Sequence, residues 1–312
     1  MIRFYKHRYK YFTISICLIL LGFIAAFMNG IQLDIQFKGG TILKYTYSTT
    51  INAEQAEKIV GQAVGKTTNC QLQSNTVKDE RMLIVSLASN EALSSQEQEA
   101  VTSALTQAYP DAQLALSESL TVEPFIGKHF FTNGMIAIAL SFLLILVYVG
   151  MRFKNIGGFS AGTMAIIALF HDVFIVTAVF IIFKIPINDS FIAAILTIIG
   201  FSINDTIVIY DRIRENEHLL DKKTPAEELV DISINQSLMR SINTNLAVFV
   251  SITIIYIFAQ IYDIGSIRNF ALPMMFGTIS GCYSTICIAG PLWAMWQNHK
   301  KQTKSDLQSA NA

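Results

Sequence analysis

The chain has 312 residues, of which 52% are hydrophobic and only 15% charged, with no net charge and a mean hydropathy of +0.44. Soluble proteins usually carry about 25% charged residues, so this composition indicates a membrane protein, and the lack of a basic excess argues against a nucleic-acid partner. The four cysteines form neither a CxxC pair nor a cysteine–histidine cluster. We therefore expect neither a disulfide framework nor a zinc site.

The first apolar run covers residues 11–29 and follows four basic residues, a pattern that is also typical of a signal peptide. The run is long enough to cross a bilayer, and Gly30-Ile31-Gln32-Leu33 behind it contains no convincing cleavage site of small residues. We therefore predict an uncleaved first span, with residues 1–30 forming a cytoplasmic N-terminus and that span.

Residues 31–130 separate the first span from the second and are predicted to fold as a domain outside the bilayer. Residues 33–47 alternate between apolar and polar side chains and end in a β-rich run, which predicts a strand. Further strands are expected at 70–77, 81–88 and 112–122, with the turn Lys78-Asp79-Glu80 between the first two.

Two helices are expected in the same domain, at 52–65 and 94–109. Asn52 and Ser94 stand three residues before Gln55 and Glu97, which is the spacing of a capping box, and Pro110 ends the second helix. The order βαββαβ is that of a ferredoxin-like α+β fold, which serves many unrelated functions. Because the domain has no nucleophile–base pair and no ligand cluster, we expect docking or polypeptide contact there rather than catalysis.

Five more apolar runs follow, each close to or above the twenty residues that a helix needs to cross a hydrocarbon core. They are predicted at 131–150, 158–183, 190–210, 242–261 and 269–296. The expected fold is thus an all-α bundle of six transmembrane helices that carries the outer domain. Residues 131–297 complete the bundle with a cytoplasmic loop at 211–240, and residues 298–312 form a cytoplasmic tail.

Lysine and arginine residues predict the orientation of the spans. Two lie in the short outer loops, Lys184 and Arg268, whereas thirteen lie in the segments assigned to the cytoplasm: Arg3, Lys6, Arg8, Lys10, Arg152, Lys154, Arg212, Arg214, Lys222, Lys223, Lys300, Lys301 and Lys304. Under the positive-inside rule, both termini are cytoplasmic and the 31–130 domain is periplasmic or otherwise extracytoplasmic.

Charged groups at membrane depth cost about 2.5–3.5 kcal/mol each on insertion scales, so they are candidates for function. His171 and Asp172 lie in the third span, Asp205 lies in the fourth, and Arg240 begins the fifth. Small residues let helices approach closely, and they recur at helical spacing on faces that we expect to form a polar, close-packed core. These faces are Gly158, Gly162, Ala165 and Ala168 beside Asp172; Ala193, Thr197, Gly200 and Asn204; Arg240, Asn243, Thr244 and Ala247; and Gly277, Gly281 and Ser284.

Asp205 and Arg240 are both expected toward the cytoplasmic third of the bundle. An opposite charge nearby favours the ionised carboxylate, whereas burial disfavours it. A carboxylate between these two influences can gain and lose a proton as the bundle rearranges, which is the chemistry of proton coupling. A static buried ion pair that fixes the helix register is the alternative, and the residues alone leave both open.

His171 and Asp172 are adjacent, and adjacent residues lie about 100° apart on a helix, so the two need not face one cavity. Proton handling and structural hydrogen bonding both remain open for them, and a single His-Asp pair is weak grounds for a metal site. A membrane enzyme with these residues as its site is disfavoured, because the chain lacks a nucleophile, a phosphate loop and a ligand set.

One segment carries a specific resemblance. Gly200-Phe201-Ser202-Ile203-Asn204-Asp205-Thr206-Ile207-Val208-Ile209-Tyr210-Asp211-Arg212-Ile213-Arg214-Glu215-Asn216 closely resembles the signature of the SecF branch of the SecD/SecF family, in the RND-like superfamily. Weaker matches extend over essentially the whole chain except the charged tail: Phe37-x-Gly39-Gly40-Thr41, Ala168-Leu169-Phe170-His171-Asp172, Asn235-Gln236-x-Leu238-x-Arg240, Ile267-Arg268-x-Phe270-Ala271 and Tyr283-Ser284-Thr285. The SecD branch normally has a much larger first outer domain, so the short 31–130 segment favours the SecF branch.

The resemblance implies a non-enzymatic auxiliary subunit of the bacterial Sec protein translocase in the cell inner membrane. Such a subunit pairs with SecD beside the SecYEG channel, with YajC and YidC as further partners, and uses the proton-motive force to draw preproteins outward. Protons are its coupling ion, and no cofactor, metal or catalytic residue is implied. Asp205 and Arg240 match family positions implicated in proton passage, and Asp172, His171 and Asn204 complete the candidate proton-coupling set. The alternative is an RND-like proton-driven exporter of lipids or small molecules, which also needs a second six-span half.

The chain departs from the family pattern in two places. Gln36 stands where the outer motif has an acid, and Asp34 is displaced from it by two residues, on the same face if the strand is regular. Ala247 and Val248 stand where the fifth span usually has hydroxyls, so the proton route is expected to be shorter or differently hydrated. Gly39-Gly40 is either a flexible point near the root of the domain or a bulge or turn.

Overall fold

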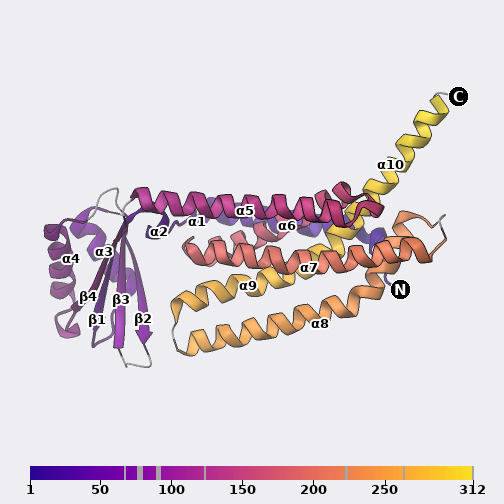
Figure 1. Cartoon of the computed structure of the whole chain (residues 1–312). Coiled ribbons are helices and arrows are strands. Elements are labelled where there is room, and N and C mark those ends of the chain that lie inside the picture. The colour runs from indigo at the N-terminus through magenta and orange to yellow at the C-terminus, as the bar shows by residue number, and fades with distance from the viewer. Residues whose placement is uncertain are drawn as a thin grey trace.

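The structure is a computed structural model that describes residues 1–66, 68–75, 80–88, 93–122, 124–221, 224–262 and 264–310. Within this part of the chain, six long apolar helical spans form a bundle, and a small α+β domain stands at one end of it (Figure 1). The spans are α1 (Arg8–Asn29), α5 (Pro124–Arg152), α6 (Gly158–Ile182), α7 (Asp189–Leu219), α8 (Ala226–Ile261) and a sixth made of α9 (Gly265–Ser284), the π-helical η4 (Thr285–Ala289) and α10 (Gly290–Ala310). The predicted fold class is confirmed. Both termini lie at the end of the bundle opposite the domain.

The helices continue beyond the predicted spans. The segment 211–240 was expected to be a loop, but α7 runs to Leu219 and α8 begins at Ala226. Lys222 and Lys223 in the short connection lie outside the described residues. A hydropathy run locates only the apolar part of a helix, and these two helices remain helical past it because buried residues such as Ile213 and Ile234 keep them packed together.

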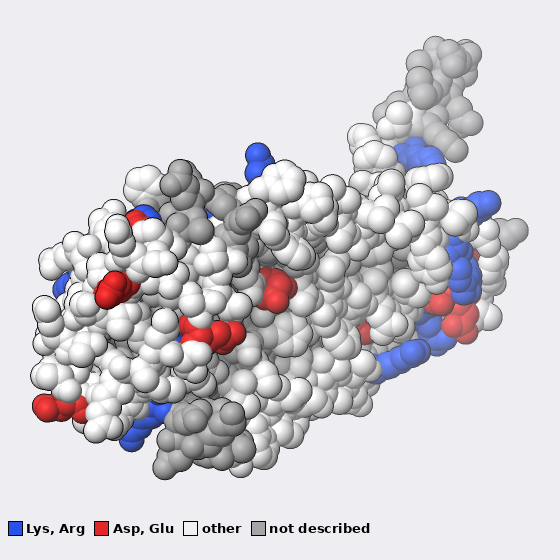
Figure 2. Space-filling model, turned by 60° about the vertical axis from the view of Figure 1, so that its left-hand side comes forward, with Lys and Arg blue, Asp and Glu red and all other residues white. Residues whose placement is uncertain are grey.

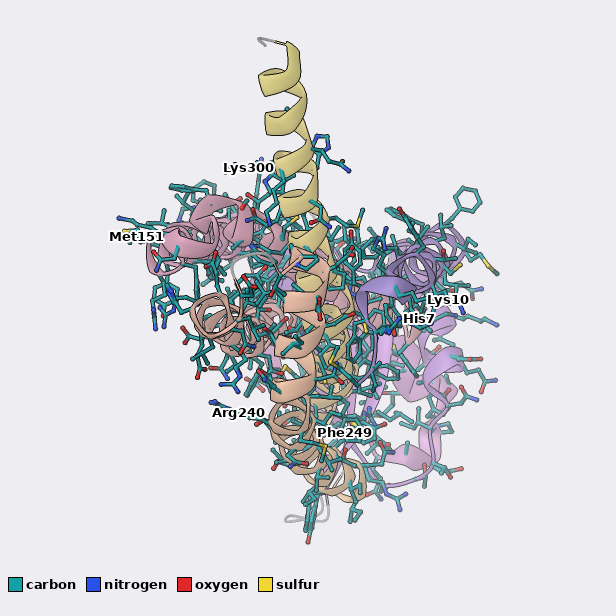
Figure 3. All side chains as sticks on the ribbon, turned by 90° about the vertical axis from the view of Figure 1, so that its right-hand side faces the viewer. His7, Lys10, Met151, Arg240, Phe249 and Lys300 are labelled. Atoms are coloured by element: carbon teal, nitrogen blue, oxygen red, sulfur yellow. The ribbon has the colours of Figure 1, made fainter. Side chains whose placement is uncertain are left out.

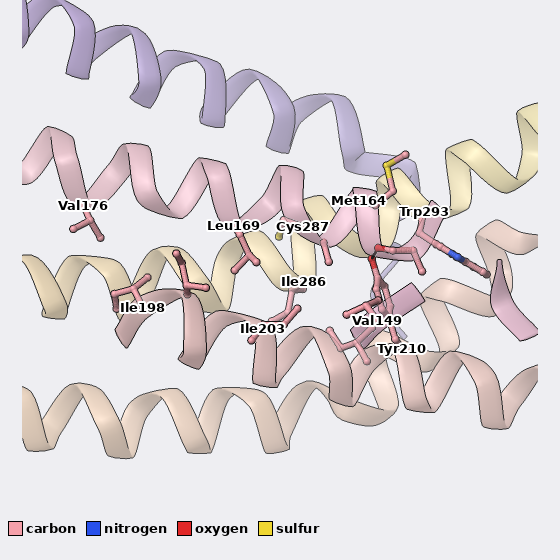
Figure 4. Close-up of a cluster of buried hydrophobic side chains, with 14 of the residues drawn as sticks. Val149, Met164, Leu169, Val176, Ile198, Ile203, Tyr210, Ile286, Cys287 and Trp293 are labelled. Carbon is pink, nitrogen blue, oxygen red and sulfur yellow. Dashed lines mark hydrogen bonds between the residues drawn. The ribbon is translucent and has the colours of Figure 1, made fainter. Parts of the chain in front are cut away.

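The bundle has an apolar core between α6, α7 and α9. Leu169 and Val176 of α6 lie against Ile198 and Ile203 of α7, with Ile286 of η4 beside them (Figure 4). Toward the end that holds the termini, Tyr210 is fully buried, and its hydroxyl donates to the Ala161 carbonyl at 3.0 Å. This packing fixes the relative positions of the three helices that carry the polar residues described below.

The outer domain is a four-stranded antiparallel sheet with two helices. Its elements are β1 (Gly40–Tyr47), α3 (Ala53–Val64), β2 (Thr68–Asn75), β3 (Glu80–Ala88), α4 (Ser95–Ala108), the short 3-10 helix η2 (Pro110–Ala112) and β4 (Ala115–Val122). The strand order is β2-β3-β1-β4, which together with the βαββαβ sequence is ferredoxin-like. Of the predicted turn Lys78-Asp79-Glu80, Lys78 and Asp79 lie outside the described residues and Glu80 begins β3.

Helices α3 and α4 cover one face of the sheet. The alternating side chains Leu43 and Tyr45 of β1 are fully buried against Val60 of α3 and Leu105 of α4. The capping box predicted at Ser94 is present, since its hydroxyl accepts from the Glu97 amide and the Glu97 carboxylate accepts from the Ser94 amide. Asn52 caps α3 by accepting from the amides of Glu54 and Gln55. Local capping signals therefore predicted both helix starts correctly.

The root of the domain differs from the prediction. Residues 33–47 were expected to form one strand, but a single helical turn, α2 (Ile35–Lys38), precedes β1. The Asp34 carboxylate caps this turn by accepting from the Gln36 amide at 3.1 Å, so Asp34 and Gln36 do not share a strand face. Gly39 and Gly40 follow with φ of 82° and 142°, which glycine adopts readily, and they form the sharp link into β1.

The α2 turn is fixed to the bundle rather than to the sheet. Phe37 packs edge-on against Phe131 of α5 with ring centroids 5.4 Å apart. A side chain at Gly127 of α5 would come within 3.0 Å of the Phe37 backbone, so glycine is needed for this close approach. The Asp34 amide donates to the carbonyl of Ile187, in the connection between α6 and α7, at 3.0 Å. The chain up to Lys38 therefore packs with the bundle, and the outer domain starts at Gly39 and Gly40.

Candidate functional site

Asp172 of α6 is the most enclosed charged side chain of the bundle among the described residues, with an exposed fraction of 0%. Its carboxylate accepts hydrogen bonds from three hydroxyls: Ser202 of α7 at 2.7 Å, and Ser280 and Ser284 of α9 at 2.6 and 2.7 Å. A buried carboxylate needs such donors, because leaving water without replacement bonds is costly. The small residues beside Asp172 therefore did predict that it faces the bundle, and the three serines tie α6 to α7 and α9.

His171 also lies inside, with an exposed fraction of 5%. Its Nδ1 is 3.3 Å from Asp172 Oδ1 and 3.4 Å from Ser280 Oγ, and its ring lies 5.9 Å from that of Tyr283. The Nε2 atom is buried and has no hydrogen-bond partner among the described residues. The structure thus brings the adjacent pair into one polar cluster and leaves one imidazole nitrogen available inside the protein.

The hydroxyl cluster extends one turn along α7 toward Asp205. The Thr206 hydroxyl lies 3.0 Å from that of Thr285, which in turn reaches the Ser202 carbonyl at 3.3 Å. Thr285 begins the π-helical stretch η4, and π-helical turns are frequent at functional sites. Ser280 was missed from the sequence, although its spacing of four residues from Ser284 on an otherwise small-residue face could have indicated it.

Asp205 is buried in the seam between α7 and α8, with an exposed fraction of 6%. Its hydrogen-bond partner is the side-chain amide of Asn245, which also donates to the Ser241 carbonyl at 2.9 Å. Asn245 was not among the candidates predicted from the sequence. It lies just before Ala247 and Val248, where the fifth span lacks the usual hydroxyls, and a single uncharged amide there does not stand out in the sequence.

Arg240 does not form the predicted direct contact with Asp205. It is close enough to act on the Asp205 carboxylate electrostatically, but the two charged groups are not within the 4.0 Å of an ion pair. Arg240 is exposed and projects from α8 at the margin of the bundle (Figure 3). It lies five residues before Asn245, about 140° around the helix, so both side chains cannot face Asp205 equally.

Two of the small-residue faces point out of the chain, contrary to the expectation that all of them form its core. On α7, Ala193, Gly200 and Asn204 are exposed, and a side chain at Gly200 would meet nothing within 4 Å. On α8, Asn243, Thr244 and Ala247 are exposed beside Arg240. By contrast, a side chain at Gly158 or Gly277 would collide with neighbouring helices. Helical spacing identifies a close-packing face but does not say whether the neighbour belongs to the same chain.

The arrangement of the described side chains does not provide a ligand set for a metal ion. Among the described residues, no group of three or more His, Cys, Asp or Glu side chains is placed to hold a metal ion. What the site contains instead is two buried carboxylates, one imidazole and a set of hydroxyls on neighbouring helices. Carboxylate, imidazole and hydroxyl groups of this kind are able to bind and release protons.

Known proteins resemble this chain over nearly its whole length. The family described as "Protein export membrane protein SecD/SecF, C-terminal" matches residues 100–299. The protein translocase subunit SecF of Alicyclobacillus acidocaldarius is 33% identical over 304 residues, which cover 95% of this chain and 94% of that protein. The SecF subunit of Sebaldella termitidis is 32% identical over 301 residues, covering 96% and 94%.

Solved structures extend the comparison to three dimensions. The crystal structure of SecDF from Thermus thermophilus, described as a translocon-associated membrane protein, aligns with a TM-score of 0.78 and 29% identity over 95% of this chain. A second SecDF crystal structure, in a super-membrane-facing form, aligns with a TM-score of 0.69 over 98% of it. The aligned part is 39% and 40% of those chains, so this chain spans about two fifths of their length.

Proposed function

This chain belongs to the SecD/SecF family of protein export membrane proteins, and we propose that it uses the proton-motive force, with a SecD-like partner, to promote preprotein export through the SecYEG channel. The observation that carries the proposal is the position of Asp205. Its carboxylate is buried between two spans and is bonded to a neutral amide. The next residue, Thr206, lies one turn along α7 from Ser202, whose hydroxyl donates to the second buried carboxylate, Asp172.

Proton coupling requires that a carboxylate be able to change its charge inside the protein. A buried ion pair resists this change, because neutralising one partner leaves the other charge unpaired. Asp205 is bonded to Asn245 instead, and a neutral amide tolerates either form of the acid, while a cation such as Arg240 brought nearer would favour the ionised form. A displacement of α8 along α7 would change the distance to Arg240 and thereby bind or release a proton. Of the two alternatives left open by the sequence, coupling therefore has the stronger support.

Asp172 and His171 supply a second proton-binding group deeper in the bundle. The serine hydroxyls around Asp172 and the hydroxyl pair of Thr206 and Thr285 can each donate and accept, so they supply parts of a relay between α6 and α7. Because Thr206 and Thr285 bond to the Ser202 carbonyl rather than to its hydroxyl, water would have to complete this relay. The unpartnered Nε2 of His171 gives the relay a further acceptor or donor. We include both residues in the proposed route.

The SecD-like partner is expected on the exposed polar faces of α7 and α8. Asn204, Arg240 and Asn243 would otherwise face acyl chains or lie at their border, which is unfavourable for polar side chains. A neighbouring span packed on Gly200 would shield them and would also close the seam that holds Asp205. The alignment with SecDF chains more than twice as long as this one supports a SecD-like half as the partner.

The outer domain is the proposed contact for the emerging preprotein, and Gly39 and Gly40 are the proposed hinge. Thr41, which follows them, holds the base of the domain together, since its hydroxyl lies 3.2 Å from that of Thr121 and accepts from the Leu93 amide at 3.3 Å. Phe37 anchors the opposite side of the hinge to α5. In this motif Phe37 is thus the anchor on the bundle, Gly39 and Gly40 are the proposed hinge, and Thr41 belongs to the sheet.

The test of coupling is Asp205→Asn, measured as preprotein translocation into inverted membrane vesicles with and without a proton-motive force. We expect the force-dependent stimulation to be lost while the complex with the partner still purifies intact. Asp211→Asn is the matched control, because Asp211 lies on the same helix but pairs with Arg152 and Arg214 at 3.2 and 2.8 Å, away from the seam. Full stimulation in the Asp205→Asn vesicles would refute the coupling role.

The test of the partner face is Gly200→Leu, measured as recovery of the SecD-like subunit and SecYEG on affinity purification. We expect recovery to fall, because a leucine would occupy the space of the neighbouring span. Ala139→Leu on the exposed side of α5 adds a similar side chain elsewhere and should leave recovery unchanged. Recovery of an outer channel and an adaptor from the unmodified chain would instead indicate a small-molecule or lipid exporter.

A further inference from the structure

The end of the bundle opposite the outer domain contains a cavity that the proposed export role does not use. It has a volume of about 310 Å³ and lies between the link from α5 to α6, the end of α7, the start of α8, and α10. Lys154, Lys300 and Lys301 line it, and Lys300 projects from α10 in the view along the bundle (Figure 3). Lysine and arginine side chains gather at this end of the molecule (Figure 2). We call it the lysine cavity, and we propose that it binds the phosphate headgroup of an anionic phospholipid.

The floor of the lysine cavity is built from hydrogen-bonded side chains. Trp293 is buried, with an exposed fraction of 3%, and its Nε1 donates to the Ile156 carbonyl at 2.9 Å. Gln297 Nε2 donates to the same carbonyl at 2.9 Å. Gly157 has a φ of 89°, and a side chain there would come within 2.8 Å of Gln297 Nε2. The backbone at residues 156–157 is therefore held in one conformation by side chains of the protein itself.

The charges around the cavity favour an anion. Three ammonium groups face two carboxylates, Glu217 and Asp221, which leaves an excess of one positive charge. No ion pair within 4.0 Å involves Lys154, Lys300 or Lys301 among the residues that the structure describes. A phosphate diester brings one negative charge and balances the excess. A ligand can therefore bind the lysine ammonium groups without first breaking an ion pair of the described residues.

The position of the cavity favours a lipid over a soluble anion. Lys154 lies four residues beyond the predicted end of the second span, and Trp293 and Gln297 lie at the end of the sixth, which places the cavity at headgroup level. Ile156, Leu220 and Leu229 add apolar surface beside the lysines, which suits the glycerol and the first methylenes of a lipid. Basic pockets between spans on the cytoplasmic side are typical sites for anionic headgroups, and lysine stems extend along apolar surface while the charge reaches the phosphate.

The test is native mass spectrometry of the full chain, purified with its partner and mixed with phosphatidylglycerol or with phosphatidylcholine. We expect phosphatidylglycerol to be retained in preference to phosphatidylcholine. The triple variant Lys154→Gln, Lys300→Gln and Lys301→Gln should reduce retention of phosphatidylglycerol about tenfold or more, since each lysine near a membrane surface contributes to attraction of anionic lipid. Glu217→Gln should increase it. All of these side chains are exposed, and an unchanged melting temperature will show that the fold is intact.

The matched control removes three positive charges from the same end of the bundle but outside the cavity, by Arg3→Gln, Lys6→Gln and Lys10→Gln. Retention by this control should equal that of the unmodified chain. Equal losses in the two triple variants would overturn the proposal, because they would show a general effect of surface charge. Equal retention of the two lipids would also overturn it. Displacement of the lipid by millimolar inorganic phosphate would show that the cavity is a site for free phosphate rather than for lipid.

Discussion

The side-chain amide of Asn245 on α8 donates a hydrogen bond to the carboxylate of Asp205 on α7, at the place where the sequence predicted a contact with Arg240. The bond crosses the seam between the two helices, so the environment of the acid depends on how α8 lies against α7. Asn245 is therefore predicted to control the acid. Asn245→Leu should cost about 1–3 kcal/mol of stability, because a buried carboxylate loses its donor, and should also weaken the response to the proton-motive force.

Thermal unfolding and vesicle translocation measure these two effects. Gln260→Leu is the control, since Gln260 is an exposed amide on the same helix and lies outside the proposed partner face. Equal behaviour of the two variants would show that the amide bond to Asp205 is unimportant.

The serine donors around Asp172 are predicted to act as one unit. Ser202→Ala, Ser280→Ala and Ser284→Ala each remove one of three hydrogen bonds to a fully buried carboxylate and should each cost about 1–3 kcal/mol. Because the three share one acceptor, double variants should depart from additivity. Thermal unfolding of the purified protein is the measurement, with Ser251→Ala on the exposed face of α8 as the control. Additive, small losses would mean that water replaces the missing hydroxyls.

The contact between α5 and α6 is predicted to depend on Gly158. A side chain at this position would overlap the Gly150 carbonyl oxygen, which is backbone and cannot rotate away. Gly158→Ala should therefore separate the helices and cost about 1–3 kcal/mol, as overpacking does elsewhere. Gly200→Ala adds the same methyl group where nothing lies within 4 Å and should have little effect on the isolated chain. The melting temperatures of the two variants compare them directly, and equal values would contradict the packing described here.

The outer domain should lose one stabilising interaction in acid. Lys66 donates to the Glu97 carboxylate at 2.6 Å, and the Ser94 amide donates at 2.9 Å, and these bonds lower the pKa of Glu97 from an ordinary 4.5 to about 2. A lowered pKa means that the interaction stabilises the fold fully above pH 4.5 and is lost as the pH falls toward 2. The difference in stability between the unmodified chain and Glu97→Gln should thus be largest above pH 4.5 and shrink below it.

Unfolding of the full chain by denaturant between pH 6 and 3 measures this difference, and Glu99→Gln provides an exposed control on the same helix. A difference that stays constant across this range would exclude the ion pair as its source.

Sidedness is predicted to follow the basic residues. Lys58→Cys in the outer domain should react with a membrane-impermeant maleimide in intact cells, whereas Lys300→Cys should react only after the membrane is opened. The native Cys70 should stay unlabelled, because burial raises the pKa of its thiol to about 12. Labelling of Lys300→Cys in intact cells would invert the predicted topology.

Much of the fold could be predicted from the sequence, because span length and helix capping are local properties. Asp172 was placed correctly because the small residues on its helix face must approach another helix. The α2 turn could not be predicted, since four residues of alternating polarity read equally well as strand, and only the Asp34 cap and the packing of Phe37 on α5 decide it. Arg240 was predicted as the partner of Asp205 from its charge, its depth in the bundle and the family resemblance, whereas the structure places the Asn245 amide against the carboxylate.

The faces of Gly200 and Asn204 show a different limit of sequence reasoning. Their spacing is the same as that of Gly158 and Gly162, yet one pair is open and the other is buried. Periodicity is a property of a helix surface, and the identity of the neighbour is a property of the assembly. The structure of the single chain shows which small-residue faces pack within it, and the faces that stay open are those left for a neighbour in the assembly.

The first residue of β1 pairs with the last residue of β4, Gly40 with Val122, so the chain enters and leaves the outer domain through two neighbouring strands. The turn α2, which precedes β1, packs closely on α5. The domain is therefore joined to the rest of the chain through a narrow connection, at Gly40 and Val122. Tilting of the domain about this connection would require changes only in a few backbone torsions. Sliding of the domain parallel to the bilayer would instead break the packing of α2 on α5. For a modest tilt, the displacement of a residue would grow with its distance from this connection, and it would be greatest at the edge of the domain farthest from the lipid.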